Sequence, residues 1–298
     1  MTLSTELTNI NELSLFERKA LNKITYGRKS YFQYLFQQDQ IDMPCDKIAN
    51  AFRHEIERLL IQKNIIDKIV PLEKLHEYLS DDMRAYHFDD GVNKISTYFY
   101  ENDEPFLNVY YQLIAYIREN IIKEPFWFQA TPTLRIHCPN AKNSNHYPRY
   151  HSDISYGHPP EEINIWLPLT DVLSGHGFRV MTTENSNKLL ETFDYDFATL
   201  IDAAIHDKNF SNTCEALANP ITTPLGKMLL FDSRCIHSGE PLKDHTRISM
   251  DIRVLPLSEY RKMHIQYQGS GRRKILFSPG HCYHEKMSDD FLNYIQGL

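Results

Sequence analysis

Polar and apolar side chains alternate along one stretch of this chain, Arg247-Ile248-Ser249-Met250-Asp251-Ile252-Arg253. In an extended strand successive side chains point to opposite faces, so the polar and the apolar residues lie on separate faces. A second stretch, Ile163-Asn164-Ile165-Trp166-Leu167-Pro168-Leu169, places Asn164 and Trp166 together on the face away from its isoleucines and leucines. An ordinary β-sandwich turns its polar face to water. Because a helix-rich region precedes these strands, we expect helices to cover the apolar faces and the polar faces to line an internal pocket.

The chain divides into a helical first part and a strand-rich second part. Apolar residues recur at helical spacing over 13–24 and 48–69, a third long helix is expected over 103–122, and 95–100 is expected to be extended. From residue 126, short runs broken by proline, glycine and asparagine indicate an antiparallel sandwich or barrel. The expected strands cover residues 126–138, 147–154, 163–169, 178–182, 226–232 and 246–255.

These elements predict a single domain over residues 1–298. A mainly helical N-terminal layer covers 1–124, and the strand core covers 125–258, with a helical insertion near 195–217. Residues 259–298 form a C-terminal extension, with a last helix over 289–296.

Composition narrows the class of protein. The chain has 298 residues, 42% of them hydrophobic, and can bury a substantial core. Its net charge of −7 argues against a nucleic-acid partner. Five dispersed cysteines without a CxxC pair indicate free thiols in a reducing compartment, and no apolar run approaches membrane-spanning length. We therefore expect a cytoplasmic protein with no membrane or nucleic-acid partner. Composition leaves open whether it is a monomer or a homodimer.

The strongest candidate site consists of His151, Asp153 and His237. On a strand, residues i and i+2 share a face, so His151 and Asp153 could bind one metal ion together. His237 follows an expected turn at 233–234 and would arrive from a second strand. Two imidazoles and one carboxylate can hold one face of Fe(II) and leave the other face open for a co-substrate and O2. These three residues are thus predicted to form a catalytic metal centre.

Other histidines compete for this role. They are the pair His87 and Asp89, the cluster His281, Cys282 and His284, and the isolated His137, His146 and His176. The pair lies in an aspartate-rich segment ahead of the strands. The cluster could bind zinc but lacks a second ligand pair. The first two isolated histidines either line the pocket or are hydrogen-bonded structural residues, and the third indicates a turn between two glycines.

Arg247 lies ten residues after His237, and Ser249 shares its strand face. A guanidinium can fork onto a carboxylate with two parallel hydrogen bonds, which lysine cannot copy. We expect Arg247 and Ser249 to bind a carboxylate of the co-substrate. The alternative is a surface ion pair of Arg247 with Asp251 or Asp244.

Further pocket contacts follow from the strand faces and the neighbouring loops. Asn164 is expected to contact the co-substrate. Substrate recognition is assigned to Trp166, Arg135, His137 and Tyr147. A buried core role is the alternative for Trp166.

Together these residues resemble the Fe(II)/2-oxoglutarate-dependent dioxygenases. The motif of that superfamily is His-x-Asp, a distant histidine and then Arg-x-Ser about ten residues later. Here it corresponds to His151-Ser152-Asp153, His237 and Arg247-Ile248-Ser249. The segment Ile165-Trp166-Leu167-Pro168-Leu169-Thr170-Asp171 is similar to the phytanoyl-CoA hydroxylase-like branch, and the closest likeness is to the streptomycin-biosynthesis-type members. The likeness extends from residue 126 to about 256.

The resemblance implies a double-stranded β-helix (jelly-roll, cupin-like) core flanked by N-terminal helices. It also implies Fe(II) on the His/Asp/His set, 2-oxoglutarate on Arg247 and Ser249, and O2 as oxidant. The expected reaction is hydroxylation or another oxidation of a small polar metabolite or natural-product intermediate, with release of succinate and CO2. Desaturation, cyclisation and epimerisation remain open. So do two other functions, a metal-dependent cupin enzyme that does not use 2-oxoglutarate and a non-catalytic jelly-roll binding protein.

Overall fold

The computed structural model of this chain describes residues 7–87, 92–99, 103–142, 149–172, 177–240, 242–269 and 274–297. Several residues singled out from the sequence lie outside these ranges, namely Asp89, His146, Tyr147 and His176. The roles expected for them therefore stay predictions.

The larger sheet is antiparallel and supplies most of the core. Along it the strands lie in the order β2, β10, β7, β12 and β5, and β6 pairs with β12 beside β5. Their bounds are β2 Gln40–Pro44, β5 Phe126–Phe128, β6 Thr133–His137, β7 Ile163–Pro168, β10 Lys227–Asp232 and β12 Arg247–Pro256. In the centre, Met250 of β12 lies between Leu167 of β7 and Leu134 of β6. All three residues are buried, which places the apolar faces of these strands in one layer.

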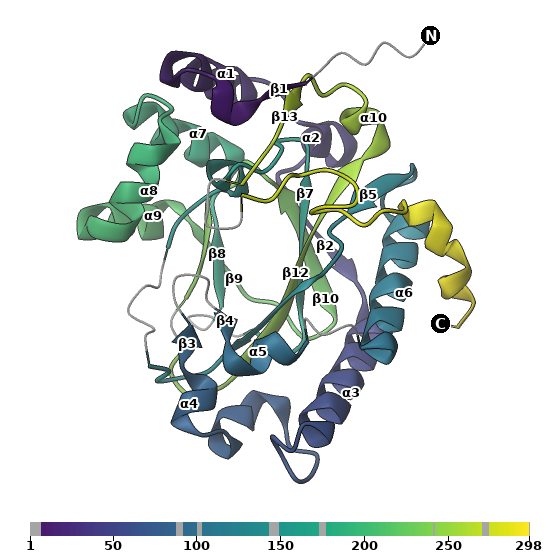
Figure 1. The fold of residues 1–298 in the computed structure, drawn as a ribbon. Coiled ribbons are helices and arrows are strands. Elements are labelled where there is room, and N and C mark those ends of the chain that lie inside the picture. The colour runs from purple at the N-terminus through teal and green to yellow at the C-terminus, as the bar shows by residue number, and fades with distance from the viewer. Residues whose placement is uncertain are drawn as a thin grey trace.

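Helices cover that apolar face. Figure 1 shows α3 (Asp46–Gln62) and α6 (Glu104–Asn120) along one side of the sheet, with the C-terminal 3-10 helix η6 (Ser288–Gly297) beside α6. Ile165 and Ile252 belong to the same buried cluster as Phe52 of α3 and Leu113 of α6. The expectation that helices cover the apolar strand faces is confirmed.

A smaller antiparallel sheet faces the other side of the large one. It contains β11 (His237–Gly239), β8 (Phe178–Val180) and β9 (Asn219–Ile221), in that order. Phe178 of β8 stacks on Trp166 of β7, with ring centroids 5.0 Å apart and an interplanar angle of 16°. The molecule therefore combines helices with two facing antiparallel sheets, and the polar faces of β7 and β12 lie between these sheets.

A second group of helices surrounds the small sheet and the end of the large one (Figure 1). Helix α1 begins with a capping box, because the Ser14 hydroxyl accepts from the backbone N–H of Glu17 while the Glu17 carboxylate accepts from that of Ser14. The α-helices of this group are α1 Leu15–Gly27, α2 Tyr31–Phe36, α7 Thr183–Thr192, α8 Phe197–His206 and α9 Lys208–Leu217.

Short elements complete the fold. The strands are β1 Thr8–Asn9, parallel to β13 Ile265–Gln266, and β3 Tyr86–His87, antiparallel to β4 Val92–Asn93. The helices are η1 Ile10–Glu12, η2 Leu72–Tyr78, α4 Asp81–Arg84, α5 Lys94–Tyr98, η5 Asp153–Tyr156 and α10 Leu257–Tyr260.

The structure corrects three expected elements. Residues 95–100 were expected to be extended, but α5 begins at Lys94, where the Asn93 side chain caps the helix by accepting from the backbone N–H of Ser96. The second long helix was expected from the spacing over 48–69, but it ends at Gln62. The helical insertion begins earlier than residue 195, because α7 already starts at Thr183.

A fourth correction concerns the segment before the candidate site. Residues 147–154 were expected to form a strand, yet His151 forms only an isolated bridge with His237, and η5 begins at Asp153. His151 and Asp153 therefore do not share a strand face, and a 3-10 turn brings the carboxylate to the site.

The five cysteines form no disulfide, as expected. No helix in the described ranges is long and apolar enough to cross a membrane.

Candidate functional site

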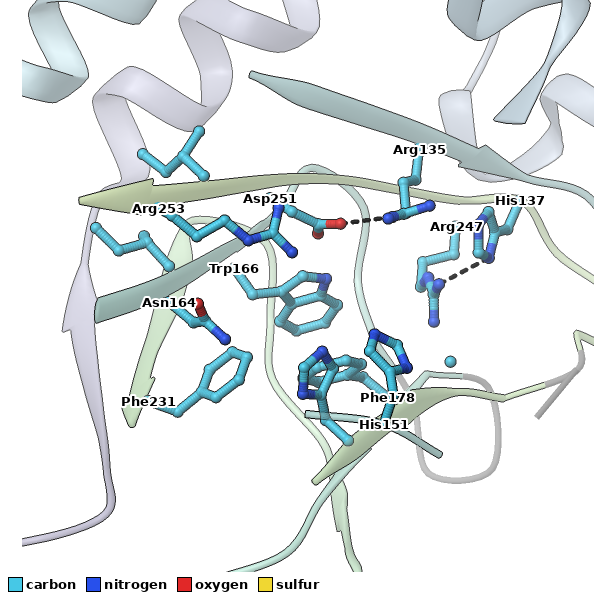
Figure 2. A pocket seen from close by; sticks show the side chains of 14 residues that line it. Arg135, His137, His151, Asn164, Trp166, Phe178, Phe231, Arg247, Asp251 and Arg253 are labelled. Atoms are coloured by element: carbon cyan, nitrogen blue, oxygen red, sulfur yellow. Dashed lines mark hydrogen bonds and ion pairs between the residues drawn. The ribbon is translucent and has the colours of Figure 1, made fainter. Parts of the chain in front are cut away.

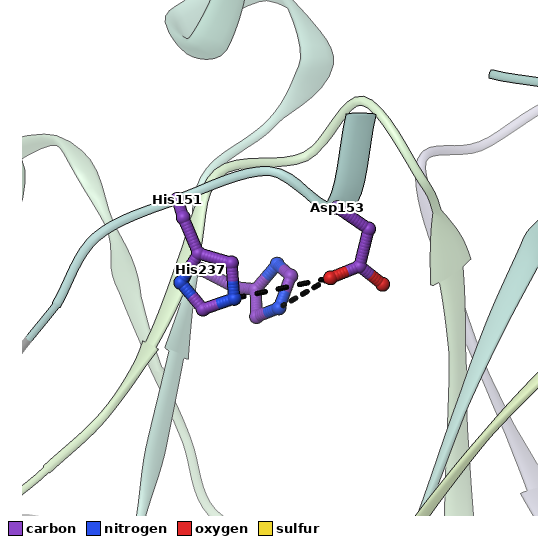
Figure 3. A group of neighbouring side chains, drawn as sticks. All are labelled: His151, Asp153 and His237. Atoms are coloured by element: carbon purple, nitrogen blue, oxygen red, sulfur yellow. Dashed lines mark ion pairs between the residues drawn. The ribbon is translucent and has the colours of Figure 1, made fainter. Parts of the chain in front are cut away.

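Three donor atoms converge at the end of the space between the two sheets (Figure 3). Nε2 of His151 and Nε2 of His237 each lie 3.8 Å from Oδ1 of Asp153. The donor atoms of the three residues lie within 4.8 Å of one another, as one metal ion would require. The side chains of Asp153 and His237 are 3% and 7% exposed, whereas that of His151 is 26% exposed, so the site opens on the His151 side.

The backbone fixes which nitrogen of each histidine faces the site. Nδ1 of His151 lies 2.9 Å from the carbonyl oxygen of Arg149, and Nδ1 of His237 lies 3.0 Å from that of Cys235. Because a carbonyl only accepts, each Nδ1 carries the proton and donates it, which leaves the lone pair on Nε2. Both rings thus turn a metal-binding lone pair toward Asp153.

The protonation states also suit a metal. Burial and, to a smaller extent, the neighbouring His237 lower the pKa of His151 to about 3, although Asp153 acts to raise it. Burial likewise lowers the pKa of His237 below its ordinary value. Both imidazoles are therefore neutral near neutral pH, which is the form that binds a cation.

Asp153 is held by Arg253, a contact that the sequence did not indicate. Nε of Arg253 donates to Oδ2 of Asp153 at 2.8 Å, which leaves Oδ1 toward the histidines. Burial alone would raise the pKa of Asp153, but Arg253, together with His158 and His237, holds it well below the ordinary value. The carboxylate is therefore ionised and offers one oxygen to the site.

A cavity of about 80 Å³, lined by both polar and apolar side chains, adjoins these residues (Figure 2). Most of its lining comes from the polar faces of β6, β7 and β12 and from the small sheet, and Phe231 of β10 also contributes. The lining residues are Arg135, His137, His151, Asn164, Ile165, Trp166, Phe178, Phe231, His237, Gly239, Arg247, Asp251, Ile252 and Arg253. Arg135 and Arg253 each pair with a carboxylate, that of Asp251 and that of Asp153. The third arginine, Arg247, contacts a backbone carbonyl and a histidine, so its guanidinium favours an anionic occupant. The internal polar pocket expected from the strand pattern is confirmed.

Arg247 lies buried at one end of this cavity, with 2% of its surface exposed. Its guanidinium donates to the carbonyl oxygen of Gly177, and its Nη2 lies 2.7 Å from Nδ1 of His137. The alternative of a surface ion pair is wrong, because Arg247 is buried and Asp251 instead pairs with Arg135 across β12 and β6.

Two buried polar side chains on the same faces have no hydrogen-bond partner among the described residues. They are Ser249, through its hydroxyl, and Asn164, through both atoms of its amide. Ser249 is 0% exposed and Asn164 is 3% exposed. Buried polar groups are nearly always paired, so these two indicate a ligand that is polar where it meets them.

The residues assigned to substrate recognition differ in their surroundings. Arg135 and Trp166 line the cavity, Arg135 in its ion pair with Asp251 and Trp166 in its stack on Phe178. His137 contacts Arg247 and so lies at the same end of the cavity as that arginine.

The C-terminal histidines do not form a metal site with their neighbours. His284 stacks on Phe128, with ring centroids 5.1 Å apart and an interplanar angle of 9°. Within the described residues, the one group of side chains arranged to hold a metal is His151, Asp153 and His237. The zinc alternative therefore has no geometric support.

No protein-family model matches the chain. A curated relative, the streptomycin biosynthesis protein StrG of Streptomyces griseus, is 23% identical over 199 residues, covering 66% of this chain and 80% of StrG. The expected resemblance to a streptomycin-biosynthesis-type protein is confirmed.

Three solved structures are also similar. The non-heme alpha ketoglutarate dependent carbocyclase SnoK from nogalamycin biosynthesis aligns with a TM-score of 0.46 and 13% identity, over 82% of this chain and 87% of SnoK. The epimerase SnoN from the same biosynthesis gives 0.43 and 13%, over 80% and 83%. EctD from S. alaskensis, solved with bound Fe, gives 0.41 and 9%, over 78% of each chain. All three TM-scores are below 0.5, so the case for a function depends on the geometry of the site.

Proposed function

We propose that this chain is an Fe(II)- and 2-oxoglutarate-dependent oxygenase that oxidises a small polar metabolite with O2 and releases succinate and CO2. The observation that carries the proposal is the convergence of two imidazole nitrogens and one carboxylate oxygen beside a polar cavity that ends in a buried arginine.

The donor set fits Fe(II). His151, Asp153 and His237 would hold the ion as two imidazoles and one carboxylate, the ligand set of non-heme iron oxygenases. When bound there with 2-oxoglutarate and O2, iron supplies an oxidant able to break a C–H bond of the substrate. The carbonyls that accept from the two Nδ1 atoms keep each ring in its binding orientation, and Arg253 keeps Oδ2 of Asp153 occupied.

The buried polar side chains on the same faces of β7 and β12 fit 2-oxoglutarate. The guanidinium of Arg247 would bind the carboxylate far from the metal, and the Ser249 hydroxyl would donate to the same group. The contact with His137 orients the guanidinium. Asn164 would bind a polar atom of the co-substrate through its amide. Because these side chains are buried, water cannot compete for the carboxylate.

The substrate class is supported more indirectly. The ion pair of Arg135 and Asp251 presents both charges to the cavity, which suits a polar molecule. The relative StrG is named for the biosynthesis of a polar natural product. Trp166, stacked on Phe178, would form a flat wall for the substrate or co-substrate.

For the architecture we propose a jelly-roll core in one catalytic domain over 1–298. Two facing antiparallel sheets, with candidate ligands at one end of the space between them, support this fold. Five free cysteines support a reducing compartment such as the cytoplasm.

The test is a succinate-release assay with Fe(II), 2-oxoglutarate and O2 against panels of amino acids, sugars, aminocyclitols and nucleosides. We expect one panel to increase succinate release above the uncoupled rate, and His151→Ala, Asp153→Ala and His237→Ala each to abolish release while the protein stays folded. His206→Ala, an exposed histidine on α8, is the matched control and should behave as wild type.

Two outcomes would favour the other functions. A protein that binds Fe(II) anaerobically but never binds 2-oxoglutarate would be a metal-dependent cupin enzyme of another kind. A protein that binds no Fe(II) at several-fold excess would be a non-catalytic binding protein.

A further inference from the structure

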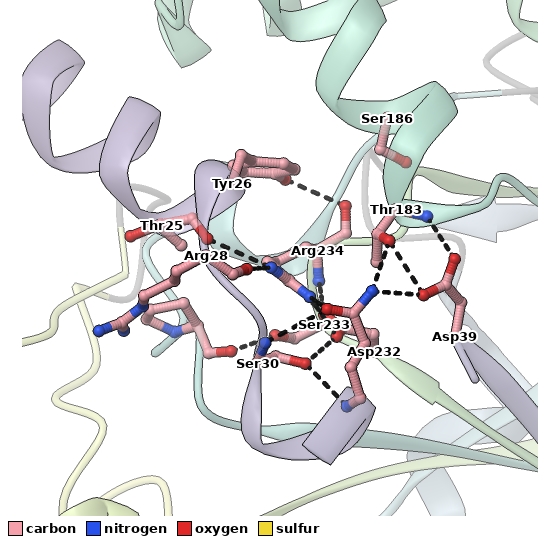
Figure 4. Close-up of polar contacts among 12 residues, drawn as sticks. Thr25, Tyr26, Arg28, Ser30, Asp39, Thr183, Ser186, Asp232, Ser233 and Arg234 are labelled. Atoms are coloured by element: carbon pink, nitrogen blue, oxygen red, sulfur yellow. Dashed lines mark hydrogen bonds and ion pairs between the residues drawn. The ribbon is translucent and has the colours of Figure 1, made fainter. Parts of the chain in front are cut away.

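The last turn of α1 is bound to the turn that precedes His237 (Figure 4). The final carbonyls of a helix have no partner within it. Here Nη1 of Arg234 donates to the carbonyl oxygen of Thr25, at 3.3 Å, and to that of Arg28, the residue that follows α1. An arginine in the turn between β10 and β11 thus caps the C-terminus of an N-terminal helix.

Arg234 is itself held in one geometry. Its Nε and Nη2 donate to the two carboxylate oxygens of Asp232, at 2.9 and 2.8 Å, and Nη2 also donates to Oε1 of Gln33 on α2, at 2.7 Å. The side chains of Arg234 and Asp232 are 2% and 1% exposed. Removing either would leave a buried charge without its partner and endanger the whole fold, so neither residue suits a selective test.

Tyr26, in the same last turn of α1, connects the two segments that carry the candidate ligands. Its buried hydroxyl lies 3.0 Å from Oγ of Ser152 and 3.1 Å from the carbonyl oxygen of Arg234. A hydroxyl has one proton and a carbonyl only accepts, so Tyr26 donates to Arg234 and accepts from Ser152. Ser152 stands between two of the ligands, and Arg234 lies three residues before the third.

The contact of Tyr26 with Ser152 positions Asp153, which the backbone hydrogen bonds between the two histidines do not do. The backbones of His151 and His237 exchange hydrogen bonds of 3.1 and 2.8 Å, which fix these two residues relative to each other. Asp153 lies beyond this bridge, in the first position of η5, and Ser152 is the N-cap residue just before it. The hydrogen bond between Tyr26 and Ser152 therefore connects α1 to the start of η5, the backbone that positions the Asp153 carboxylate.

We propose that Tyr26 is a positioning residue of the metal centre: its hydroxyl ties Ser152 to the turn before His237 and so sets where Asp153 lies relative to the two histidines. The inference rests on the metal site of the proposed function. It gives the N-terminal helical layer a role in metal binding, although Tyr26 touches none of the three ligands.

The test measures metal binding without turnover. Co(II) replaces Fe(II), because it does not oxidise readily and its visible absorption reports the coordination geometry. Calorimetric titration of Tyr26→Phe should show the Kd for Co(II) raised about tenfold or more, the range typical of outer-shell substitutions. Its Co(II) spectrum should also differ from that of wild type. Ser152→Ala, which removes the same hydrogen bond from the other side, should give the same two changes.

A double variant and a matched control distinguish a specific effect of the Tyr26 hydroxyl from general destabilisation of the protein. Tyr26→Phe removes both hydrogen bonds of the tyrosine hydroxyl, and Ser152→Ala removes one of them, so the double variant should weaken Co(II) binding no more than Tyr26→Phe alone. Tyr31→Phe on α2 removes a hydroxyl that bonds Glu124 at 2.6 Å, and should bind Co(II) as wild type does.

Wild-type Co(II) affinity and spectrum in folded Tyr26→Phe or Ser152→Ala would overturn the positioning role and leave the proposed function standing. Equal losses in Tyr31→Phe would overturn it as well, since the effect would then be general destabilisation. Failure of the wild-type protein itself to bind Co(II) or Fe(II) would overturn the metal site and, with it, this inference.

Discussion

Arg247 is a buried cation on the polar face of β12, at one end of the cavity. In the complex with 2-oxoglutarate, Arg247→Ala would leave a buried carboxylate uncompensated, a loss of about 3–5 kcal/mol. We expect the Kd for 2-oxoglutarate to rise by roughly two to three orders of magnitude, measured anaerobically by calorimetry. Arg247→Lys should fall between, because it keeps the charge and loses the fork.

The matched control for Arg247 is Arg118→Ala. Arg118 forms an ion pair with Asp289 on the helix-covered side of the large sheet, away from the cavity. A loss of 2-oxoglutarate binding in Arg118→Ala as large as in Arg247→Ala would contradict the assignment.

Arg253 lies on the same strand face as Arg247. From the sequence alone, Arg253→Ala would serve as a control for Arg247→Ala. The structure shows otherwise, because Arg253 holds Oδ2 of Asp153. Arg253→Met keeps most of the side-chain volume and removes the donor, so the affinity for Fe(II) or Co(II) should fall about 10–100-fold. At saturating metal, the Kd for 2-oxoglutarate should stay near the wild-type value. A large change in that Kd with unchanged metal affinity would place Arg253 on the co-substrate instead.

At the scale of the element, the two faces of β7 are expected to have different roles. One face packs in the core and should contribute to stability, and the other lines the cavity and should contribute to ligand binding. Ile165 packs in the helix-covered core, so Ile165→Ala should lower the free energy of unfolding by about 2–5 kcal/mol. Asn164, next to it, faces the cavity with an amide that has no partner among the described residues. Asn164→Ala should therefore not lower the free energy of unfolding, yet should weaken 2-oxoglutarate binding.

Urea denaturation of Ile165→Ala and Asn164→Ala measures their free energies of unfolding, and calorimetric titration measures their affinities for 2-oxoglutarate. Equal destabilisation by the two substitutions would show that Asn164 is a core residue and not a ligand-facing one.

The strands that the sequence identified well are those with a strict alternation. In the alternating parts of β12 and β7 the isoleucines pack in the helix-covered core, while Arg247, Asp251, Arg253, Asn164 and Trp166 line the cavity. The two faces of these strands can therefore be assigned from the residue types alone. The segment before Asp153 has no such alternation, and a 3-10 turn there depends on contacts with β11 that lie far off in the chain. The convergence of His151, Asp153 and His237 could therefore be predicted, and the turn that presents Asp153 could not.

At the scale of the whole molecule, ligand binding at the site should raise the free energy of unfolding of the protein. A ligand that binds only the folded state at 100 times its Kd stabilises that state by about 2.7 kcal/mol, or roughly 5–10 °C in Tm for a large domain. We expect such a shift with Co(II) and 2-oxoglutarate together, followed by scanning calorimetry. Asp153→Ala should show almost none of it, and a full shift in that variant would mean that the metal binds elsewhere.

The helical layer and its general place over the sheet could be predicted, since its periodicity is local. The attachment of α1 and α2 to the site could not. Arg234 is a single arginine in a turn, and its partners on α1 lie more than 200 residues earlier, at a separation of 209 residues for Thr25. No local pattern marks such a pairing, and only the folded chain brings it together.

That separation has a consequence for the order in which the molecule forms during synthesis. The carbonyl oxygen of Arg28 leaves the ribosome 206 residues ahead of the guanidinium that binds it, about 10 to 40 s earlier at ordinary translation rates. The tie of α1 to the core through Arg234 must therefore wait until most of the protein exists. The nascent chain cannot assemble the candidate metal site early, and a product truncated before residue 234 would lack both the arginine and His237.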